Sequence, residues 1–347
     1  MNNKALSDQF NWIFIIIAGA VILLFFFSMI QKQQSLSLAK TDSTIVRQIE
    51  TLVTVAGTEK NTVSTKEVPN IDLSFQCRKR GISCECSYTS GSMSRDFNQR
   101  IIFAPKKITG TQLHLWSLSW DVPNRITNFL FASNDRHKYI IVKNNNQNLF
   151  NEIKKLIPER FNVQYVDAFS DVSSIQNNNY ESVTIALLNT PTSGTNLNTP
   201  MQFKGITKFV VVNPSSNEIN IGSEKRYYLE TPQILGALFS SDVDMFECNS
   251  MKSFERLEAV ASIQIGRITK ISSALTTTPP TRSSCTALYG TITAPLQNIY
   301  TNAKTLRDGL LTSTTSSSSP VSIIKTNSQL LKNKNEDLVR NGCPSIY

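Results

Sequence analysis

The stretch that decides the fold is Val183–Asn189, VTIALLN, a short apolar run without a charge. Two comparable runs lie at Lys138–Val142 (KYIIV) and Ile206–Pro214 (ITKFVVVNP). Short apolar runs are typical of strands buried on both faces, which occur in parallel sheets covered by helices. Between them, Leu149–Phe161 (LFNEIKKLIPERF) has the pattern of an amphipathic helix. Residues 136–247 are therefore predicted to form an α/β layered domain with a mostly parallel sheet.

Four polar residues follow the predicted strands of this domain, namely Lys143, Asp167, Asn189 and Asn213. The carboxyl ends of parallel strands meet at one edge of a sheet, where α/β proteins bind ligands. These side chains are therefore candidates for lining a ligand cleft. The loop KNNNQN after the first strand has no glycine to admit a phosphate, and the chain has no glycine-rich nucleotide motif, GxSxG or HExxH. The sequence predicts no cofactor.

The regions on either side of this domain have different patterns. Residues 67–135 contain alternating runs that predict a small antiparallel β-unit. His114 lies in one of these runs, where a lone histidine favours a structural role. Residues 248–347 have apolar positions spaced three and four apart, which predicts a C-terminal three-helix bundle. A helix is also predicted over Thr231–Phe239, with Pro232 in its first turn.

A membrane segment is predicted near the N-terminus. Trp12–Ile30 (WIFIIIAGAVILLFFFSMI) contains 19 residues without a charge, and roughly 20 apolar residues span a bilayer as a helix. Residues 1–31 are therefore expected to be a transmembrane anchor, and residues 32–66 a helical stalk and linker. The alternative is a cleaved secretory signal, because Ala18-Gly19-Ala20 resembles a signal-peptidase site.

The chain contains six cysteines: Cys77, Cys84, Cys86, Cys248, Cys285 and Cys343. Their spacing gives neither a zinc motif nor a CxxC redox motif, so no metal site is expected. Buried free thiols are one interpretation. Disulfides are the other, and they require an oxidising compartment. If three helices run up, down and up, Cys285 and Cys343 lie at the same end and form a bond.

The remaining cysteines leave two pairings open. If the hairpin turn has four residues, Cys77 lies opposite Ile82, and its near diagonal neighbour is Cys84. We therefore pair Cys77 with Cys84 and Cys86 with Cys248. The exchange of Cys84 and Cys86 between these bonds is equally open.

Orientation depends on two opposing signals. Lys4 lies on the N-terminal side of the apolar segment, whereas Lys32, Lys40 and Arg47 follow it, so the positive-inside rule leans towards a cytoplasmic body. The cysteines favour the opposite orientation. We expect a single-pass protein of the cell membrane, with a cytoplasmic N-terminus and a C-terminal body outside.

The composition limits the partners. The chain has 347 residues and a formal net charge of +9, but it has no basic stripe with interleaved aromatic residues, so we expect no nucleic-acid partner. The membrane is one expected partner. A protein in the envelope, or further copies of this chain, is the other.

Two resemblances concern the N-terminal region. Lys4-Ala5-Leu6-Ser7 followed by an apolar run resembles the class III signal peptide of archaeal type IV pilin-like proteins. In that family a peptidase cuts after the glycine or alanine, and the apolar helix then packs into a filament. Phe10 stands where that family often has a carboxylate. The apolar segment, the CxC pair and the terminal NGCPSIY are similar to archaeal single-pass proteins with large cysteine-containing outer domains, which implies a location and no chemistry.

Three functions follow from these features. An anchor, a stalk and a disulfide-bonded body favour a structural or binding protein without catalysis. The first alternative is a pilin-like filament or secretion-assembly subunit processed after Ala5. The second is an envelope hydrolase that uses carboxylates such as Asp167 or the cluster of Asp242, Asp244 and Glu247.

Overall fold

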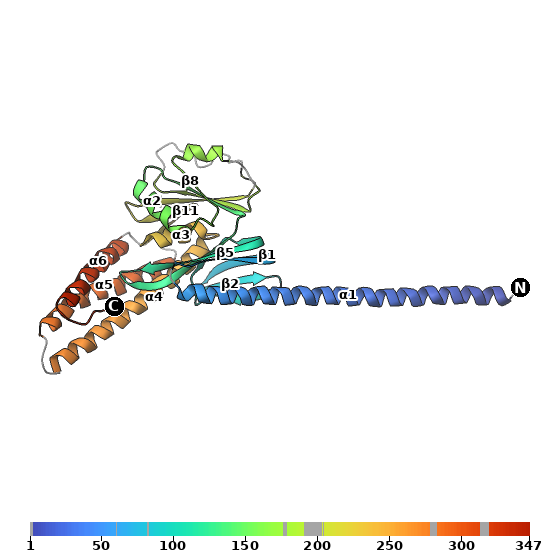
Figure 1. The fold of residues 1–347 in the computed structure, drawn as a ribbon, viewed down its shortest axis with the longest axis horizontal. Helices are drawn as coiled ribbons and strands as arrows, with labels where there is room; N and C mark the ends of the chain where they lie inside the picture. The colour runs from blue at the N-terminus through green and yellow to red at the C-terminus, as the bar shows by residue number, and fades with distance from the viewer. Residues whose placement is uncertain are drawn as a thin grey trace.

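The computed structural model describes residues 3–59, 61–81, 83–175, 179–190, 203, 205–277, 283–312 and 319–347. A long N-terminal helix projects from a body that contains two six-stranded sheets and three long C-terminal helices (Figure 1). The mixed α/β class predicted from the apolar runs is therefore confirmed.

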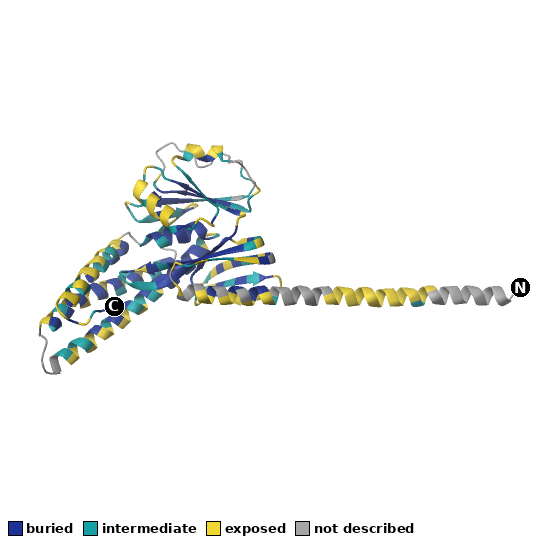
Figure 2. Ribbon diagram, in the orientation of Figure 1, coloured by how far each residue is buried: buried dark blue, intermediate teal, exposed yellow. Residues whose placement is uncertain are grey.

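The described apolar segment of helix α1 (Asn3–Thr58), residues 16–33, projects away from the body (Figure 2). Its large apolar side chains between Ile16 and Ile30 are 54–69 % exposed. The segment Ile16–Gln33 is long and apolar enough to cross a membrane, since its 18 residues extend about 27 Å at about 1.5 Å each. A helix of this kind near the N-terminus serves either as an anchor or as a signal sequence.

The second half of α1 belongs to the core of the body. Ile45, Ile49 and Val53 recur every four residues, so they lie on one face of the helix, and each is at most 4 % exposed. They pack against one face of the first sheet. The expected stalk over residues 32–66 is thus corrected: part of it is a core helix, and its last residues already belong to β1 (Val63–Arg80).

The first sheet has the strand order β3-β2-β1-β5-β6-β4. Its other strands are β2 (Ser83–Ser90), β3 (Met93–Asp96), β4 (Ile102–Phe103), β5 (Lys107–Asp121) and β6 (Arg125–Ser133). All its pairings are antiparallel except that of β4 with β6, which is parallel. One face carries α1, and the opposite face presents Trp116, Trp120 and Phe131 to the main core. The predicted antiparallel β-unit therefore contains one parallel pairing.

The second sheet has the order β12-β11-β10-β9-β7-β8. Its strands are β7 (His137–Val142), β8 (Val163–Val166), β9 (Ser182–Leu187), β10 (Ile206–Asn213), β11 (Glu218–Ile221) and β12 (Glu224–Tyr227). Strands β10, β9, β7 and β8 are parallel, whereas β11 and β12 add antiparallel hairpins. Helix α2 (Gln147–Leu156) packs on one face, and the 3₁₀-helix η1 (Phe169–Ser174) packs on the other.

Helix α3 (Thr231–Phe239) lies between the two sheets and coincides with the helix predicted from the sequence. All of its residues except Pro232 are buried. Gly236 lies against the ring of Phe103, where an added Cβ would be 2.7 Å from the nearest ring carbon. Glycine is required at this position because the helix and β4 approach so closely.

Three long helices complete the chain: α4 (Val243–Thr277), α5 (Ser283–Thr312) and α6 (Ser319–Arg340). Helix α5 packs against both α4 and α6. After α6, Gly342 has a φ of 66°, and the amide of Cys343 donates to the carbonyl oxygen of Leu338 at 2.9 Å, which is a glycine-dependent helix end.

The main core continues across the expected domain boundaries. A single cluster of buried side chains joins both sheets to α3, α4, α5 and α6. The expected boundary at 66/67 falls inside β1, and the boundary at 247/248 falls inside α4.

Candidate functional site at the disulfide-bonded junction

The polar edge of the second sheet is the first candidate site. In register, Val142 pairs with both Val166 and Leu187, and Leu187 pairs with Val211. The residues predicted to follow these strands therefore lie along one edge: Lys143, Asp167, Asn189 and Asn213.

Contacts within the polar edge satisfy several of its groups. Lys143 Nζ lies 2.6 Å from Asp167 Oδ1, and Asn144 Nδ2 donates to the carbonyl oxygen of Asn189 at 3.0 Å. Asn213 is part of the β10–β11 hairpin, where it pairs with Glu218. The structure thus assembles the predicted residues as an ion pair and an amide-bridged turn. Ligand binding there stays a prediction.

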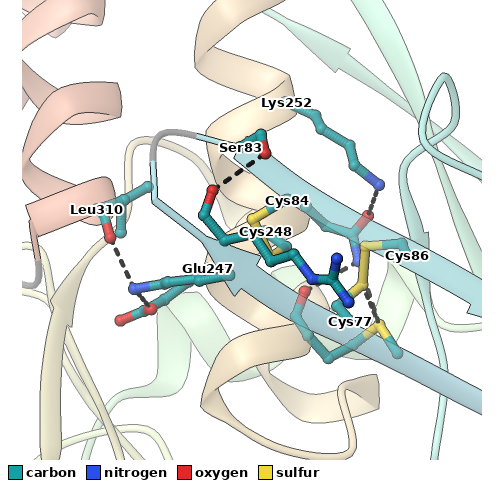
Figure 3. The surroundings of a disulfide bond; sticks show 12 residues. Cys77, Ser83, Cys84, Cys86, Glu247, Cys248, Lys252 and Leu310 are labelled. Carbon is teal, nitrogen blue, oxygen red and sulfur yellow. Dashed lines mark hydrogen bonds and ion pairs between the residues drawn. A yellow bond between two sulfur atoms is a disulfide. The ribbon is translucent and has the colours of Figure 1, made fainter.

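The second candidate is the junction where the β1–β2 hairpin meets α4, which we define by Cys77, Cys84, Cys86, Glu247 and Cys248 (Figure 3). Within the hairpin, Arg80 pairs with Ser83, so only two residues separate the strands. Ile82 itself is outside the described residues. This turn is shorter than the four-residue turn assumed from the sequence.

The position of the turn, at residues 81–82, decides the disulfide pairing at the junction. Cys77 lies directly opposite Cys86 and forms a bond with it, with 4.1 Å between the Cα atoms. Cys84 points to the same face two residues earlier and bonds to Cys248 of α4, with 5.5 Å between the Cα atoms. The pairing of Cys77 with Cys84 and of Cys86 with Cys248 was therefore wrong, and the exchange left open is the one present.

A buried carboxylate, Glu247, connects the junction to β12 directly and to α5 through Lys79. Glu247 is 1 % exposed and forms ion pairs with Lys79 of β1 and Arg226 of β12. Lys79 Nζ also donates to the carbonyl oxygen of Leu310, in α5, at 2.7 Å. Burial, followed by the nearby Arg226 guanidinium, lowers the pKa of Lys79. Glu247 therefore holds strands from both sheets against the helical region.

The carboxylates proposed for hydrolysis have separate structural environments. Asp242 Oδ1 accepts from the amide of Met245 at 2.9 Å, which is a helix N-cap contact. Asp244 is exposed in the first turn of α4, where a negative charge is favourable. Glu247 is buried in its ion pairs. Asp167, on the second sheet, is paired with Lys143. These contacts account for the residues through capping and ion pairing.

The third disulfide joins Cys285, near the start of α5, to Cys343, just after α6. Their Cα atoms are 5.7 Å apart, and this is the bond that the up-down-up arrangement predicts. Arg267 of α4 donates to the carbonyl oxygen of Ile346 at 2.9 Å, so the C-terminal residues are also held against the first of the three helices.

The two histidines contact neighbouring strands and loops. His137 is 2 % exposed. Its Nδ1 lies 2.6 Å from Ser182 Oγ, and its Nε2 lies 2.8 Å from the carbonyl oxygen of Lys107. Burial lowers the pKa of His137, although the neighbouring Glu181 acts in the opposite direction. His114 Nε2 lies 3.0 Å from Asp135 Oδ1.

Several residues of the junction carry no signal in the sequence. Lys79 belongs to an ordinary basic turn, Arg226 to a short strand, and Met245 to a helix start. Met245 Sδ lies 3.5 Å from Cys77 Sγ. Met245 and Lys79 meet through the packing of α4 on the hairpin, and Arg226 reaches them from β12 through its ion pair with Glu247. Comparisons of this chain with protein-family models, curated proteins and solved structures found no match.

Proposed function

We propose that this chain is a single-pass membrane protein of the cell envelope with a structural or binding role and no catalysis. Its N-terminus lies in the cytoplasm and its body lies outside. The exposed apolar segment Ile16–Gln33 supports the membrane part of this proposal. All six cysteines are paired in bonds, which supports an oxidising surrounding for the body.

The observation that carries the proposal is the continuity of α1 from the apolar segment into the core. Ile45, a buried core residue of α1, comes 12 residues after Gln33, which is about 18 Å along a helix. Because in this proposal the same helix spans the membrane and packs on β5 and β6 of the first sheet, the body is held at a fixed height above the bilayer. A rigid spacer suits a protein that presents a surface to an envelope partner or to another copy.

The C-terminal helices are proposed to form part of the surface that the body presents to its partner. In this proposal, residues 248–347 act as a three-helix bundle that extends away from the membrane helix, with the Cys285–Cys343 bond fixing one end. Its partner is a protein rather than a nucleic acid.

The test combines a topology reporter with non-reducing peptide mapping of protein extracted from membranes. Alkaline phosphatase fused after Tyr347 should be active, and a green fluorescent protein at the same position should be dark when exported through the general secretory route. Peptide mapping should recover three disulfides. Six free thiols together with a bright fluorescent fusion would place the body in the cytoplasm and refute the orientation.

A second candidate, the filament subunit, is favoured by the two halves of α1. The first half is apolar and exposed, and the second half is buried against a mostly antiparallel sheet. A filament in which subunits pack through an apolar helix requires a free helix of this kind joined rigidly to a folded body. The resemblance of Lys4-Ala5-Leu6-Ser7 to a class III signal peptide supports the same function.

N-terminal sequencing separates the two candidates. A filament subunit cut after Ala5 begins at Leu6, whereas a plain anchor keeps the residues before it. Cysteine substitutions at Ile22 and Phe26, in the exposed apolar half, should cross-link copies of a filament into ladders. An intact N-terminus and only monomers after cross-linking would exclude the filament function and leave the anchored-protein proposal in place.

A further inference from the structure

The four cysteines of the junction, together with Met245, form a dense cluster of sulfur atoms. The Sγ atoms of Cys77, Cys86 and Cys248 all lie within 4.8 Å of one another, and all three residues are buried. Cys84 Sγ is bonded to Cys248 Sγ, and the thioether of Met245 lies 3.5 Å from Cys77 Sγ. Figure 3 shows the sulfur atoms converging between the hairpin and α4.

We propose that, before its disulfides form, the chain binds one zinc ion through the thiolates of Cys77, Cys84, Cys86 and Cys248. Zinc favours four thiolates in a tetrahedron with Zn–S distances of about 2.3 Å, which places the sulfurs about 3.8 Å apart. Three of the four sulfurs already lie within 4.8 Å of one another, and the fourth, Cys84 Sγ, is bonded to Cys248 Sγ, so side-chain rotations after reduction can bring the four towards this geometry. The inference goes beyond the proposed function, because it concerns the reduced chain rather than the mature body.

Contacts other than the disulfides hold the two elements of this site together. The hairpin is paired by backbone hydrogen bonds from Leu73 to Arg80. Helix α4 is fixed to β4 by Asn249, whose Nδ2 donates to the carbonyl oxygen of Ile102 at 2.7 Å and whose Oδ1 accepts from the amide of Ile102 at 3.2 Å. The ion pair of Glu247 with Lys79 adds a third contact. The positions of the four thiols are therefore maintained by the fold as well as by the bonds.

Two basic side chains lie near the cluster, where four thiolates and one Zn²⁺ would carry a net charge of −2. Lys79 pairs in register with Cys84, but its ammonium is already ion-paired with Glu247. Lys252 lies one helical turn after Cys248, and burial lowers its pKa to about 7. The positions of the sulfur atoms, rather than the surrounding charge, therefore support zinc binding here.

The spacing of the cysteines hides this site in the sequence. Three ligands come from a short hairpin, and the fourth is 164 residues away from Cys84. The Cys285–Cys343 pair offers only two thiolates instead of four, so its removal serves as an internal control for zinc binding at the junction.

The experiment uses the full-length chain in detergent, reduced with a phosphine in the absence of metal. For each disulfide the phosphine donates two electrons to the sulfur atoms, which breaks the sulfur–sulfur bond, and is itself oxidised to a phosphine oxide. Water supplies the oxygen atom and two protons, so two thiols form. Cobalt(II) is then titrated in as an optical probe, followed by zinc, and circular dichroism records the fold before and after.

We expect one cobalt ion per chain, with the thiolate charge-transfer and visible d–d absorption of tetrahedral sulfur coordination, and its displacement by zinc. The variant Cys285→Ser/Cys343→Ser should give the same spectrum, whereas Cys84→Ser/Cys248→Ser should lose it. The proposal is overturned if the reduced chain gives no such spectrum, whether it stays folded or unfolds. It is equally overturned if the spectrum persists without Cys84 and Cys248. None of these results depends on membrane orientation, so failure here is distinguishable from failure of the proposed function.

Discussion

Removal of the Cys84–Cys248 disulfide should destabilise the protein more than removal of either other disulfide. A disulfide stabilises the folded state largely by restricting the unfolded chain, and the effect grows with the length of the loop it closes. The separation is 164 residues for Cys84–Cys248, which gives about 5 kcal/mol. The separation is 58 for the Cys285–Cys343 bond, which gives about 4 kcal/mol.

The Cys77–Cys86 bond supplies the matched control. Its separation of nine residues gives only about 3 kcal/mol. Both of its cysteines are buried, whereas Cys84 is only partly buried, so replacement by serine costs the control at least as much in lost burial. The excess loss in Cys84→Ser/Cys248→Ser therefore reports loop closure.

Urea unfolding of the three double-serine variants, followed by circular dichroism, measures this order. Each variant keeps its other two disulfides, which peptide mapping verifies. We expect the free energy of unfolding to fall most for the Cys84–Cys248 variant and least for the Cys77–Cys86 variant. An equal or larger loss in the Cys77–Cys86 variant would refute the loop-closure reasoning.

Three further changes test individual contacts. Glu247→Gln removes the buried carboxylate that pairs with Lys79 and Arg226, although Arg226 keeps its contact with Glu224, and should cost about 3–5 kcal/mol in urea unfolding. Its control Glu85→Gln, in an exposed ion pair, should cost less than about 1 kcal/mol, so similar losses would contradict the role given to burial. Gly236→Ala places a Cβ against the ring of Phe103 and should lower stability by about 1–3 kcal/mol; an unchanged unfolding midpoint would show that the ring moves freely. Burial lowers the pKa of His137 below 6.5, so under acidic conditions the unfolded chain binds a proton at this residue more readily than the native protein does. The contribution of His137 to the free energy of unfolding is therefore complete above pH 6.5 and declines as the pH falls below it. His137→Gln should flatten the decline, and an identical pH profile would assign it to other groups.

The parts of the fold that could be predicted are those encoded by continuous local patterns. VTIALLN became the buried strand β9, and Thr231–Phe239 became α3, because an apolar run or a helical period specifies its element without help from distant residues. Strands β4 and β12 contain two and four residues, which is too short for a period to appear. Their existence depends on the neighbouring strands.

The candidate site was less predictable, because it depends on the position of a turn and on distant packing. The turn lies at residues 81–82 rather than 78–81, which moves the residue opposite Cys77 from Ile82 to Cys86, and the sequence RKRGIS leaves the position of the turn open. The face formed by Ile45 and Ile49 suits a stalk as well as a core helix, and only its contact with the sheet distinguishes them. The ends of β7, β8 and β9 lie together because these strands run in one direction, which local patterns suffice to predict, whereas ligand binding at that edge stays a prediction.

The Cys84–Cys248 bond also determines whether the two fragments stay attached when the backbone is cleaved. It closes a covalent ring that contains the whole second sheet, so cleavage of one peptide bond inside the ring, such as that before Pro214 in the β10–β11 hairpin, leaves both fragments attached. Such a nicked protein migrates as one band on a denaturing gel without reductant and as two bands with it. Cleavage between Cys248 and Cys285 instead releases a C-terminal fragment under both conditions. A single cut is thus held together between Cys84 and Cys248 and again between Cys285 and Cys343, but not in the segment between these two rings.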